Sequence, residues 1–335
     1  MTKYLLFPLL TLLISGAAHA EQCAWDQKGL AGMPTPAGEP TDVTVRIYVN
    51  DIIAIRDAEQ SFVADVLFRA DWQDVRLAHP GPLPCSAEAG QIWTPVLQLL
   101  NRREIERIRE PQIAVAPDGT VTFLIRSYGE FTFRADLSDF PFDTQELSFN
   151  IVSTYGREHV NLVTGPELVG ITEEPSVANW RISRAESRST TEYIQPVDKH
   201  LARLDIVFDA ERLTGYYTWQ QLLPLFLVVM MTWVVFWIPL EYVPPRVGLA
   251  ATAMLTLIAY RFAMSAVLPP IAYLTRLDLF IIGASVLVYV GLAATVAVSY
   301  IFERHSEANA LALNRTMRWL SPLLLLLLSV AVFYS

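Results

Sequence analysis

Long apolar stretches dominate the C-terminal part of the chain. Three of them carry no charged side chain, and the fourth is interrupted only by Arg261. These stretches are residues 213–240, 247–275, 279–302 and 319–335. A helix of ~20 residues crosses the ~30 Å hydrocarbon core of a bilayer, so we expect a transmembrane domain over residues 213–335. Its four helices are expected at about 215–240, 246–267, 277–302 and 311–334.

The first residues predict export across a membrane. Lys3 precedes an apolar run, and Ala18-His19-Ala20 forms a small-x-small cleavage pattern. We interpret residues 1–20 as a removed signal peptide rather than a retained anchor helix, because the apolar run is too short to span a bilayer. An exported domain at residues 21–212 and an even number of spans then place both ends of the chain on the same outer side.

The charges exclude several classes of protein. The chain has 34 Asp and Glu against 25 Lys and Arg, and the acidic excess lies entirely before residue 213. This balance gives no basic surface for nucleic acid. The connections between the apolar stretches are too short to hold a catalytic domain. We therefore expect no enzymatic activity, no cofactor and no nucleic-acid partner.

The exported part has the pattern of an all-β domain. Apolar and polar residues alternate over 43–49, 121–125 and 131–134, and Pro and Gly separate these segments. Short strands at this spacing predict an antiparallel sandwich. Residues 101–110 are highly charged and are expected to form a helical turn or a loop. The predicted fold class is an all-β extracellular sandwich followed by a four-helix, all-α transmembrane domain.

Two cysteines lie in the exported part. We predict that Cys23 and Cys85 form one disulfide in an oxidising compartment, with two free thiols as the alternative. The sequence contains neither a CxxC nor an HExxH motif, so no metal site is expected. Both cysteines follow the predicted cleavage site.

Several motifs, taken in order, resemble one family. The exported part contains Trp72-Gln-Asp-Val-Arg-Leu77, Trp93-Thr-Pro95 and Phe140-Pro-Phe-Asp143, and Arg212-Leu-Thr-Gly-Tyr-Tyr217 leads into the first apolar stretch. The second apolar stretch begins with Pro244-Pro-Arg-Val-Gly-Leu249. This order resembles the pentameric ligand-gated ion channels of the Cys-loop receptor superfamily.

The resemblance implies a bacterial member of that family. Phe133 and Leu147 stand where animal members carry the two cysteines of the signature loop, here residues 133–147, and the long insert before the last span is missing. The implied protein is a homopentamer around a central pore in the bacterial inner membrane, with its N-terminal domain and C-terminus in the periplasm. Its implied partners are the lipid bilayer, permeant monovalent ions and a small-molecule or proton agonist.

The second apolar stretch is the implied pore helix. Its pore-lining residues are predicted to be Gly248, Thr252, Leu255, Ala259, Phe262 and Ala266. They recur every three or four residues and so share one helix face, although Val247, Met254, Ile258 and Ser265 form a second such stripe, and only the resemblance chooses between them. Leu255 is the predicted hydrophobic gate.

Charge selectivity receives conflicting signals. The Pro244–Leu249 motif resembles the inner pore mouth of anion channels, with Arg246 at the helix start. The acidic exported domain and Glu241, which could form a carboxylate ring at the inner mouth, favour cations. We expect cation selectivity, with anion selectivity as the alternative.

Agonist and coupling residues also follow from the resemblance. An aromatic agonist wall is expected from Trp72, Tyr155 and Tyr193, although Leu99-Leu100 leave the cage incomplete and Trp72 is alternatively a core residue. The residues expected to couple the sandwich to the pore are Asp57, Glu59, Pro141, Asp143, Arg212, Pro269 and Tyr273. Within this set, Arg212 is predicted to pair with Asp143 or Glu59, since an unpaired and partly desolvated charge is costly.

Two other functional classes stay open. A membrane-anchored periplasmic binding module would need only one helix. A secondary transporter would be expected to carry charged midplane residues or a pair of broken helices.

Overall fold

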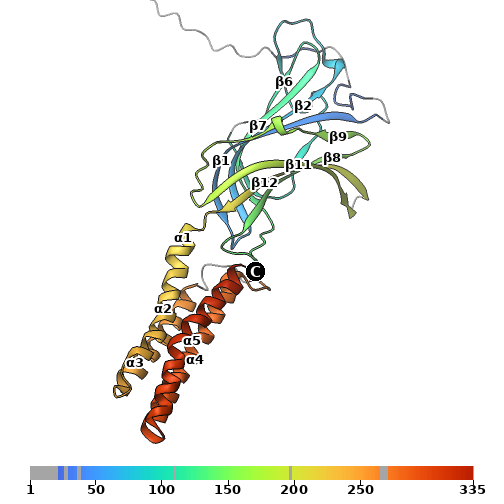
Figure 1. Cartoon of the computed structure of the whole chain (residues 1–335). Helices are drawn as coiled ribbons and strands as arrows, with labels where there is room; N and C mark the ends of the chain where they lie inside the picture. Colours follow the sequence, from blue (N-terminus) through green and yellow to red (C-terminus); the bar gives the residue numbers. More distant parts are fainter. Residues whose placement is uncertain are drawn as a thin grey trace, which may run out of the picture.

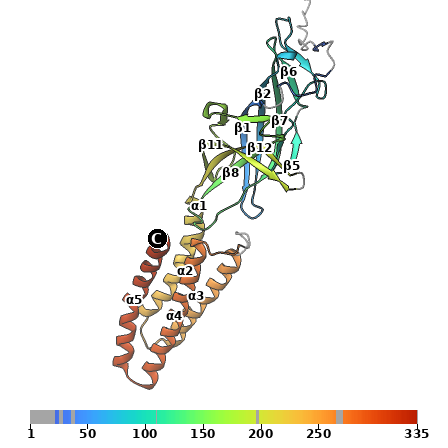
Figure 2. The ribbon, with the colours of Figure 1, turned by 90° about the vertical axis from the view of Figure 1, so that its right-hand side faces the viewer.

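The chain folds into a β-sandwich that continues into a bundle of four long helices (Figures 1 and 2). The computed structural model describes residues 22–25, 29–35, 39–108, 110–195, 198–264 and 271–334. The predicted signal peptide, pore residue Ala266 and coupling residue Pro269 lie outside the described residues. The C-terminal end of the last helix lies at the sandwich end of the bundle (Figure 1). The predicted fold class is confirmed.

The described residues form two sheets. The larger sheet contains β1 (Thr41–Arg56), β2 (Ser61–Gln73), β3 (Cys85–Ala87), β5 (Arg102–Arg107), β6 (Gln112–Val115), β7 (Thr120–Thr132), β9 (Val160–Val163) and β10 (Val169–Ile171). Its order is β10-β1-β2-β7-β6-β3, with β9 beside β1 and β5 beside β7. The smaller sheet contains β4 (Leu97–Leu99), β8 (Thr144–Gly156), β11 (Trp180–Ile194) and β12 (Lys199–Arg212), in the order β11-β12-β8-β4. Only β9 and β10, which run parallel to β1, depart from antiparallel pairing among these strands.

Aromatic side chains join the two sheets. Phe62 of β2 and Phe131 of β7 stack with their ring centroids 5.4 Å apart. Phe131 meets Phe149 of β8 edge to face at 4.9 Å, and Phe149 meets Phe208 of β12 at 6.0 Å. All four side chains are buried, so the apolar face of each sheet packs against that of the other.

Two strand predictions were wrong. Residues 101–110 contain strand β5 and not a helical turn or loop. The prediction failed because nearly all side chains of this strand are exposed and its sequence lacks alternation. The strands expected at 121–125 and 131–134 are one strand, β7. Gly129 lies within β7 and does not separate two strands. A Cβ atom at this position would come within 2.7 Å of the Glu104 carbonyl oxygen, so only glycine allows β5 to approach β7 so closely.

The N-terminal segment packs over one end of the sandwich. Cys23 and Cys85 form the predicted disulfide, which links this segment to β3. Leu30 is buried, and its carbonyl accepts a hydrogen bond from the Trp93 N–H at 2.8 Å. A covalent and a hydrogen-bonded contact therefore both hold the segment in place.

The first span is irregular. It runs from Gly215 to Trp237 through α1 (Gly215–Tyr217), a π-helical turn (Thr218–Leu222), α2 (Leu223–Val234) and a 3₁₀ turn (Val235–Trp237). It ends earlier than expected because Ile238, which precedes Pro239, is extended with a ψ of 134°.

The other three spans are continuous helices. They are α3 (Val243–Met264), α4 (Arg276–Arg304) and α5 (Glu307–Phe333). α3 begins before the expected residue 246, because the first turn of a helix tolerates Pro244 and Pro245. All four spans are long and apolar enough to cross a membrane.

Candidate functional site

Arg212 is the centre of an ion-pair cluster at the end of β12. The residue is only 3% exposed. It donates to both carboxylate oxygens of Asp143, at 2.7 and 3.0 Å, and to both of Asp57, at 2.8 and 3.0 Å. The pair with Asp143 agrees with the prediction, whereas the second partner is Asp57 rather than Glu59. Among the described residues, the Glu59 side chain forms no hydrogen bond or ion pair, and its backbone carbonyl accepts from Arg103.

Three aromatic rings enclose the Arg212 guanidinium. Its central carbon lies 4.1 Å from the ring centroid of Trp180, 4.8 Å from that of Phe140 and 5.5 Å from that of Tyr217. Burial lowers the pKa of Arg212, but the hydrogen bonds that Arg212 donates to Asp143 and Asp57 outweigh this effect and raise the pKa above its ordinary value. Arg212 therefore stays charged, and its charge is balanced by carboxylates within a desolvated, aromatic site.

The signature loop joins this cluster to the membrane helices. The backbone N–H groups of Arg276 and Leu277, at the start of α4, donate to the carbonyls of Ser138 and Phe140 at 3.0 and 3.2 Å. The Tyr273 hydroxyl accepts from the Leu137 N–H at 3.0 Å. Pro141 is buried in the same loop. The structure thus brings together Asp57, Asp143, Arg212 and Tyr273, four of the predicted coupling residues, at the junction of the two domains.

One face of α3 is exposed along its length. The exposed residues include five of the predicted pore-lining positions, Gly248, Thr252, Leu255, Ala259 and Phe262. Leu255 is 68% exposed. The opposite face, with Ala250, Ala253 and Leu257, is buried against the other helices. In the alternative stripe Val247 and Met254 are half-buried, so the described part of the predicted stripe is the more exposed of the two.

Arg246 and Glu241 lie in different environments at the distal end of the bundle. Arg246 is 0% exposed and donates to the Asn314 side-chain oxygen at 2.7 Å and to the Ile238 carbonyl at 3.2 Å. Its guanidinium therefore points into the bundle and not along the exposed face of α3. Glu241, in the loop before α3, is exposed.

Trp72 lies inside the sandwich. It is 3% exposed, and its ring meets that of Trp93 edge to face at 6.0 Å. This is the core position that the sequence left as an alternative, and it offers no exposed agonist wall in the subunit. Strand alternation is the signal that identifies it, because Arg69 and Asp71 of β2 pair with each other on the opposite face.

The other two predicted agonist residues differ in exposure. Tyr155 is half-buried, with its ring 5.6 Å from that of Trp93. Tyr193 is 49% exposed near the end of β11, packs on His200 and donates from its hydroxyl to Asp198 at 2.9 Å. Tyr193 is thus the one of the three that presents a ring to the surface.

Both parts of the chain match known protein families. The model of the neurotransmitter-gated ion-channel ligand binding domain matches residues 32–209, and that of the neurotransmitter-gated ion-channel transmembrane region matches residues 221–332. The chain belongs to the neurotransmitter-gated ion-channel family. Family membership confirms the predicted resemblance to Cys-loop receptors and the prediction that the chain is not an enzyme. With its four spans, this family member is a multi-pass membrane protein.

An animal receptor subunit is among the relatives of this channel-family chain. The gamma-aminobutyric acid receptor subunit beta-4 of Gallus gallus is 27% identical over 306 residues. The match covers 82% of this chain and 61% of the relative, so the chain spans less than two thirds of that protein's length.

Two members of the Arg212 cluster lie between the two regions by which the family is recognised. The matched regions end at residue 209 and begin again at residue 221, and both Arg212 and Tyr217 fall in this interval. Sequence reasoning identified Arg212 but not the enclosing rings of Trp180 and Tyr217. The Arg212–Tyr217 motif is a sequence signal for Tyr217, whereas no local signal indicated Trp180. Trp180 reaches Arg212 because the pairing of β11 with β12 places these two residues opposite each other.

Proposed function

We propose that this chain assembles as a homopentameric ion channel in the bacterial inner membrane, opened by a small molecule or a proton that binds the periplasmic β-sandwich. Ligand binding would shift a closed-to-open equilibrium by its difference in affinity for the two states. Family membership supports this function, and the short connection between Arg304 of α4 and Glu307 of α5 supports the bacterial assignment. The proposed channel passes ions passively.

The exposed face of α3 carries the proposal. A single subunit leaves Leu255 and the small or polar residues Gly248 and Thr252 on one accessible helix face. Five such faces around an axis would line a pore, with a hydrophobic ring at Leu255 that excludes water when narrow. A helix that served only as an anchor would have no need for Gly and Thr at these positions.

Planar-bilayer recording of the reconstituted protein tests this function. We expect discrete single-channel steps, and we expect Leu255→Ser to raise the open probability or the agonist sensitivity because a hydroxyl stabilises water at the ring. Thr252→Ser, on the same face, is the matched control and should leave gating close to that of the unsubstituted chain. Saturable flux without steps would favour a carrier, and ligand binding without any current would favour an anchored binding module.

Cation selectivity is the proposed ionic preference. Two features support it: Glu241 is exposed beside the start of α3, and the charge of Arg246 is directed into the bundle. Carboxylate rings select cations at close range. The Pro244–Leu249 motif and the likeness to a gamma-aminobutyric acid receptor subunit favour the alternative, an anion channel.

A tenfold dilution of external NaCl separates the two ionic preferences. A reversal potential that moves toward the sodium equilibrium value supports cation selectivity. A shift toward the chloride value would establish the alternative.

The proposed agonist region is the surface around Tyr193. An exposed aromatic ring suits an ammonium group through cation–π attraction, worth ~0.5–2 kcal/mol. His200 and Asp198 contact Tyr193 directly, and Tyr155 packs against Trp93. A recording series over small amines and over pH identifies the class of agonist, and Tyr193→Phe against Tyr193→Leu separates the role of the ring from that of the hydroxyl.

A further inference from the structure

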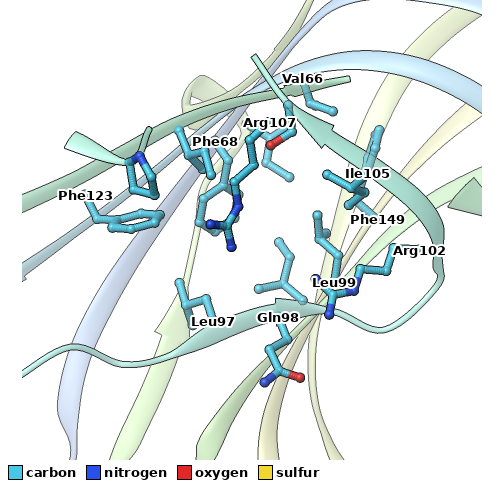
Figure 3. A pocket seen from close by; sticks show the side chains of 15 residues that line it. Val66, Phe68, Leu97, Gln98, Leu99, Arg102, Ile105, Arg107, Phe123 and Phe149 are labelled. Carbon is cyan, nitrogen blue, oxygen red and sulfur yellow. The ribbon is translucent and has the colours of Figure 1, made fainter. Parts of the chain in front are cut away.

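Arg246 is a buried cation whose hydrogen-bond partners are neutral. Unpaired arginines of the sandwich, such as Arg102 and Arg107 in the wall of the cavity shown in Figure 3, are exposed, so water solvates their charge. Arg246 is 0% exposed, and within the described residues no carboxylate pairs with it. Its Nε atom, also buried, has no partner among these residues. Burial of a charge in such surroundings is costly, so it depends on the few groups that accept from the guanidinium.

Asn314 of α5 is the side chain that accepts from this guanidinium. Its Oδ1 atom accepts from Arg246 at 2.7 Å, whereas the Ile238 carbonyl, the backbone acceptor, lies at 3.2 Å. Asn314 is 2% exposed, and its Nδ2 atom donates to the Phe236 carbonyl at 2.9 Å. One amide therefore accepts from α3 and donates to the end of the first span. Aspartate could replace the first contact only, and leucine could replace neither.

Arg246 lies close to the proposed inner mouth of the pore. It belongs to the first turn of α3, two residues before Gly248 of the exposed face and five residues after the exposed Glu241. A long arginine side chain readily extends its charged head toward water. Without an acceptor in the bundle, the guanidinium would move to the aqueous end of α3, beside Glu241. A cation there would offset the charge of that carboxylate.

We propose that Asn314 sets the ionic preference of the channel by positioning Arg246, although Asn314 belongs to α5 and lies away from the exposed face of α3. This inference rests on the proposed channel function. In a pentamer, the contact keeps five guanidinium groups inside the helix bundles and leaves five Glu241 carboxylates unopposed. Charges within the ~8 Å Debye length of the mouth act most strongly on passing ions, so a side chain that relocates one of them changes selectivity.

Arginine modification of the full-length protein in nanodiscs tests the positioning of Arg246 without any measurement of current. The probe is p-hydroxyphenylglyoxal, which reacts with accessible guanidinium groups, and peptide mass spectrometry reports each site. We expect Arg246 to react about tenfold faster or more in Asn314→Leu than in the unsubstituted chain, because its buried state loses an acceptor. Arg261, exposed on the same helix, should react equally in both. Equal protection of Arg246 in both proteins would overturn the proposal, whatever the recordings show about conduction.

Reversal potentials in asymmetric NaCl then test the effect on ions. Asn314→Leu should lower the permeability ratio of sodium to chloride about threefold or more, because the released guanidinium groups offset Glu241. The ratio should fall whichever ion the unsubstituted channel prefers, so the inference and the proposed preference are tested separately. Asn314→Asp, which keeps an acceptor for Arg246, should stay close to the unsubstituted chain.

The matched control is Thr316→Leu, which replaces an exposed polar side chain of the same helix. It should leave the permeability ratio unchanged. Equal falls in Thr316→Leu and Asn314→Leu would contradict a specific role for Asn314.

A double variant separates positioning from general damage to the bundle. If Asn314 acts through Arg246, Asn314→Leu should have no further effect on the permeability ratio once Arg246→Gln has removed the charge. A fall of the same size in the Arg246→Gln background would overturn the assignment. Size-exclusion chromatography checks assembly before each recording. Asn314→Ala, a smaller truncation with the same expected outcomes, takes the place of Asn314→Leu should the latter not assemble.

Discussion

Arg212 and Arg246 lie at opposite ends of the first membrane span, and both are almost fully buried. Arg212 is held by two carboxylates, Asp57 and Asp143. Arg246 is held by neutral oxygens, and its Nε atom has no partner among the described residues. Two arginine side chains are thus buried to a similar extent in surroundings of opposite charge. The outer cluster, around Arg212, carries an excess of negative charge, and the inner cluster, around Arg246, carries a positive charge.

The difference follows from what surrounds each arginine. The outer cluster belongs to the acidic sandwich, where loops bring carboxylates to the guanidinium. The inner arginine faces the C-terminal end of the first span, whose last carbonyls carry partial negative charge. Arg318 also donates to one of these carbonyls, that of Phe236, at 2.8 Å. The outer site therefore depends on ion pairs, and the inner site depends on helix dipoles and amides.

Removal of Arg212 should have the largest effect. Arg212→Gln leaves two carboxylates without their cation in a desolvated site, so we expect a loss of ~3–5 kcal/mol in the free energy of unfolding and poor assembly. Thermal unfolding and size-exclusion chromatography measure both. Arg181→Gln, which breaks the exposed pair with Glu211, is the matched control and should cost only ~0–1 kcal/mol. Equal losses in the two variants would break the comparison.

The two carboxylates of the outer cluster should contribute unequally to the free energy of unfolding. The Asp143 side chain is 2% exposed and that of Asp57 is 17% exposed. We expect Asp143→Asn to cost ~2 kcal/mol and Asp57→Asn less, because water partly replaces the contact at Asp57. Chemical unfolding of each variant and of the double variant gives the coupling. A larger loss for Asp57→Asn would show that the exposed side of the cluster dominates.

Removal of Arg246 should cost less than removal of Arg212. Arg246→Gln leaves the neutral oxygens of Asn314 and Ile238 without their donor but leaves no opposite charge unpaired, so we expect ~1–2 kcal/mol of destabilisation. The same thermal assay measures it, with Arg261→Gln, an exposed arginine of the same helix, as the control. A loss as large as that of Arg212→Gln would contradict the distinction between paired charges and dipoles.

Glu241→Gln should have the smallest effect on stability. The residue is exposed, so the free energy of unfolding should change by less than ~0.5 kcal/mol. The permeability ratio of sodium to chloride should nevertheless fall, since the proposed carboxylate ring is lost. Reversal potentials in asymmetric NaCl measure this ratio, and Glu303→Gln is a control at the end of α4. An unaltered ratio would remove Glu241 from the selectivity proposal.

The sequence predicted the architecture well because burial patterns are local. The four apolar stretches and the alternation in β1 each reflect contacts that repeat along one element. β5 escaped prediction because its exposed edge position removes that pattern. The strand break predicted near Gly129 was wrong because glycine occurs both in turns and where two strands approach closely. Only the pairing with β5 distinguishes the two cases.

The site was predicted less completely because it depends on contacts between distant elements. Asp57 and Glu59 lie two residues apart beside one hairpin turn, and the turn's geometry decides which of them reaches Arg212. The motif placed Trp72 among the expected agonist residues with a core position as the alternative, and its alternation with Arg69 and Asp71 is the signal that favours the buried position.

The hydrogen bonds from α4 to the signature loop have a mechanical consequence. The first-turn N–H groups of a helix lack partners within the helix, and here Arg276 and Leu277 use the carbonyls of Ser138 and Phe140. The loop and the head of α4 therefore translate together, since any separation would strip these donors of their acceptors. Bending between the two domains must then occur on either side of this joint, which moves as one rigid unit and does not act as a hinge.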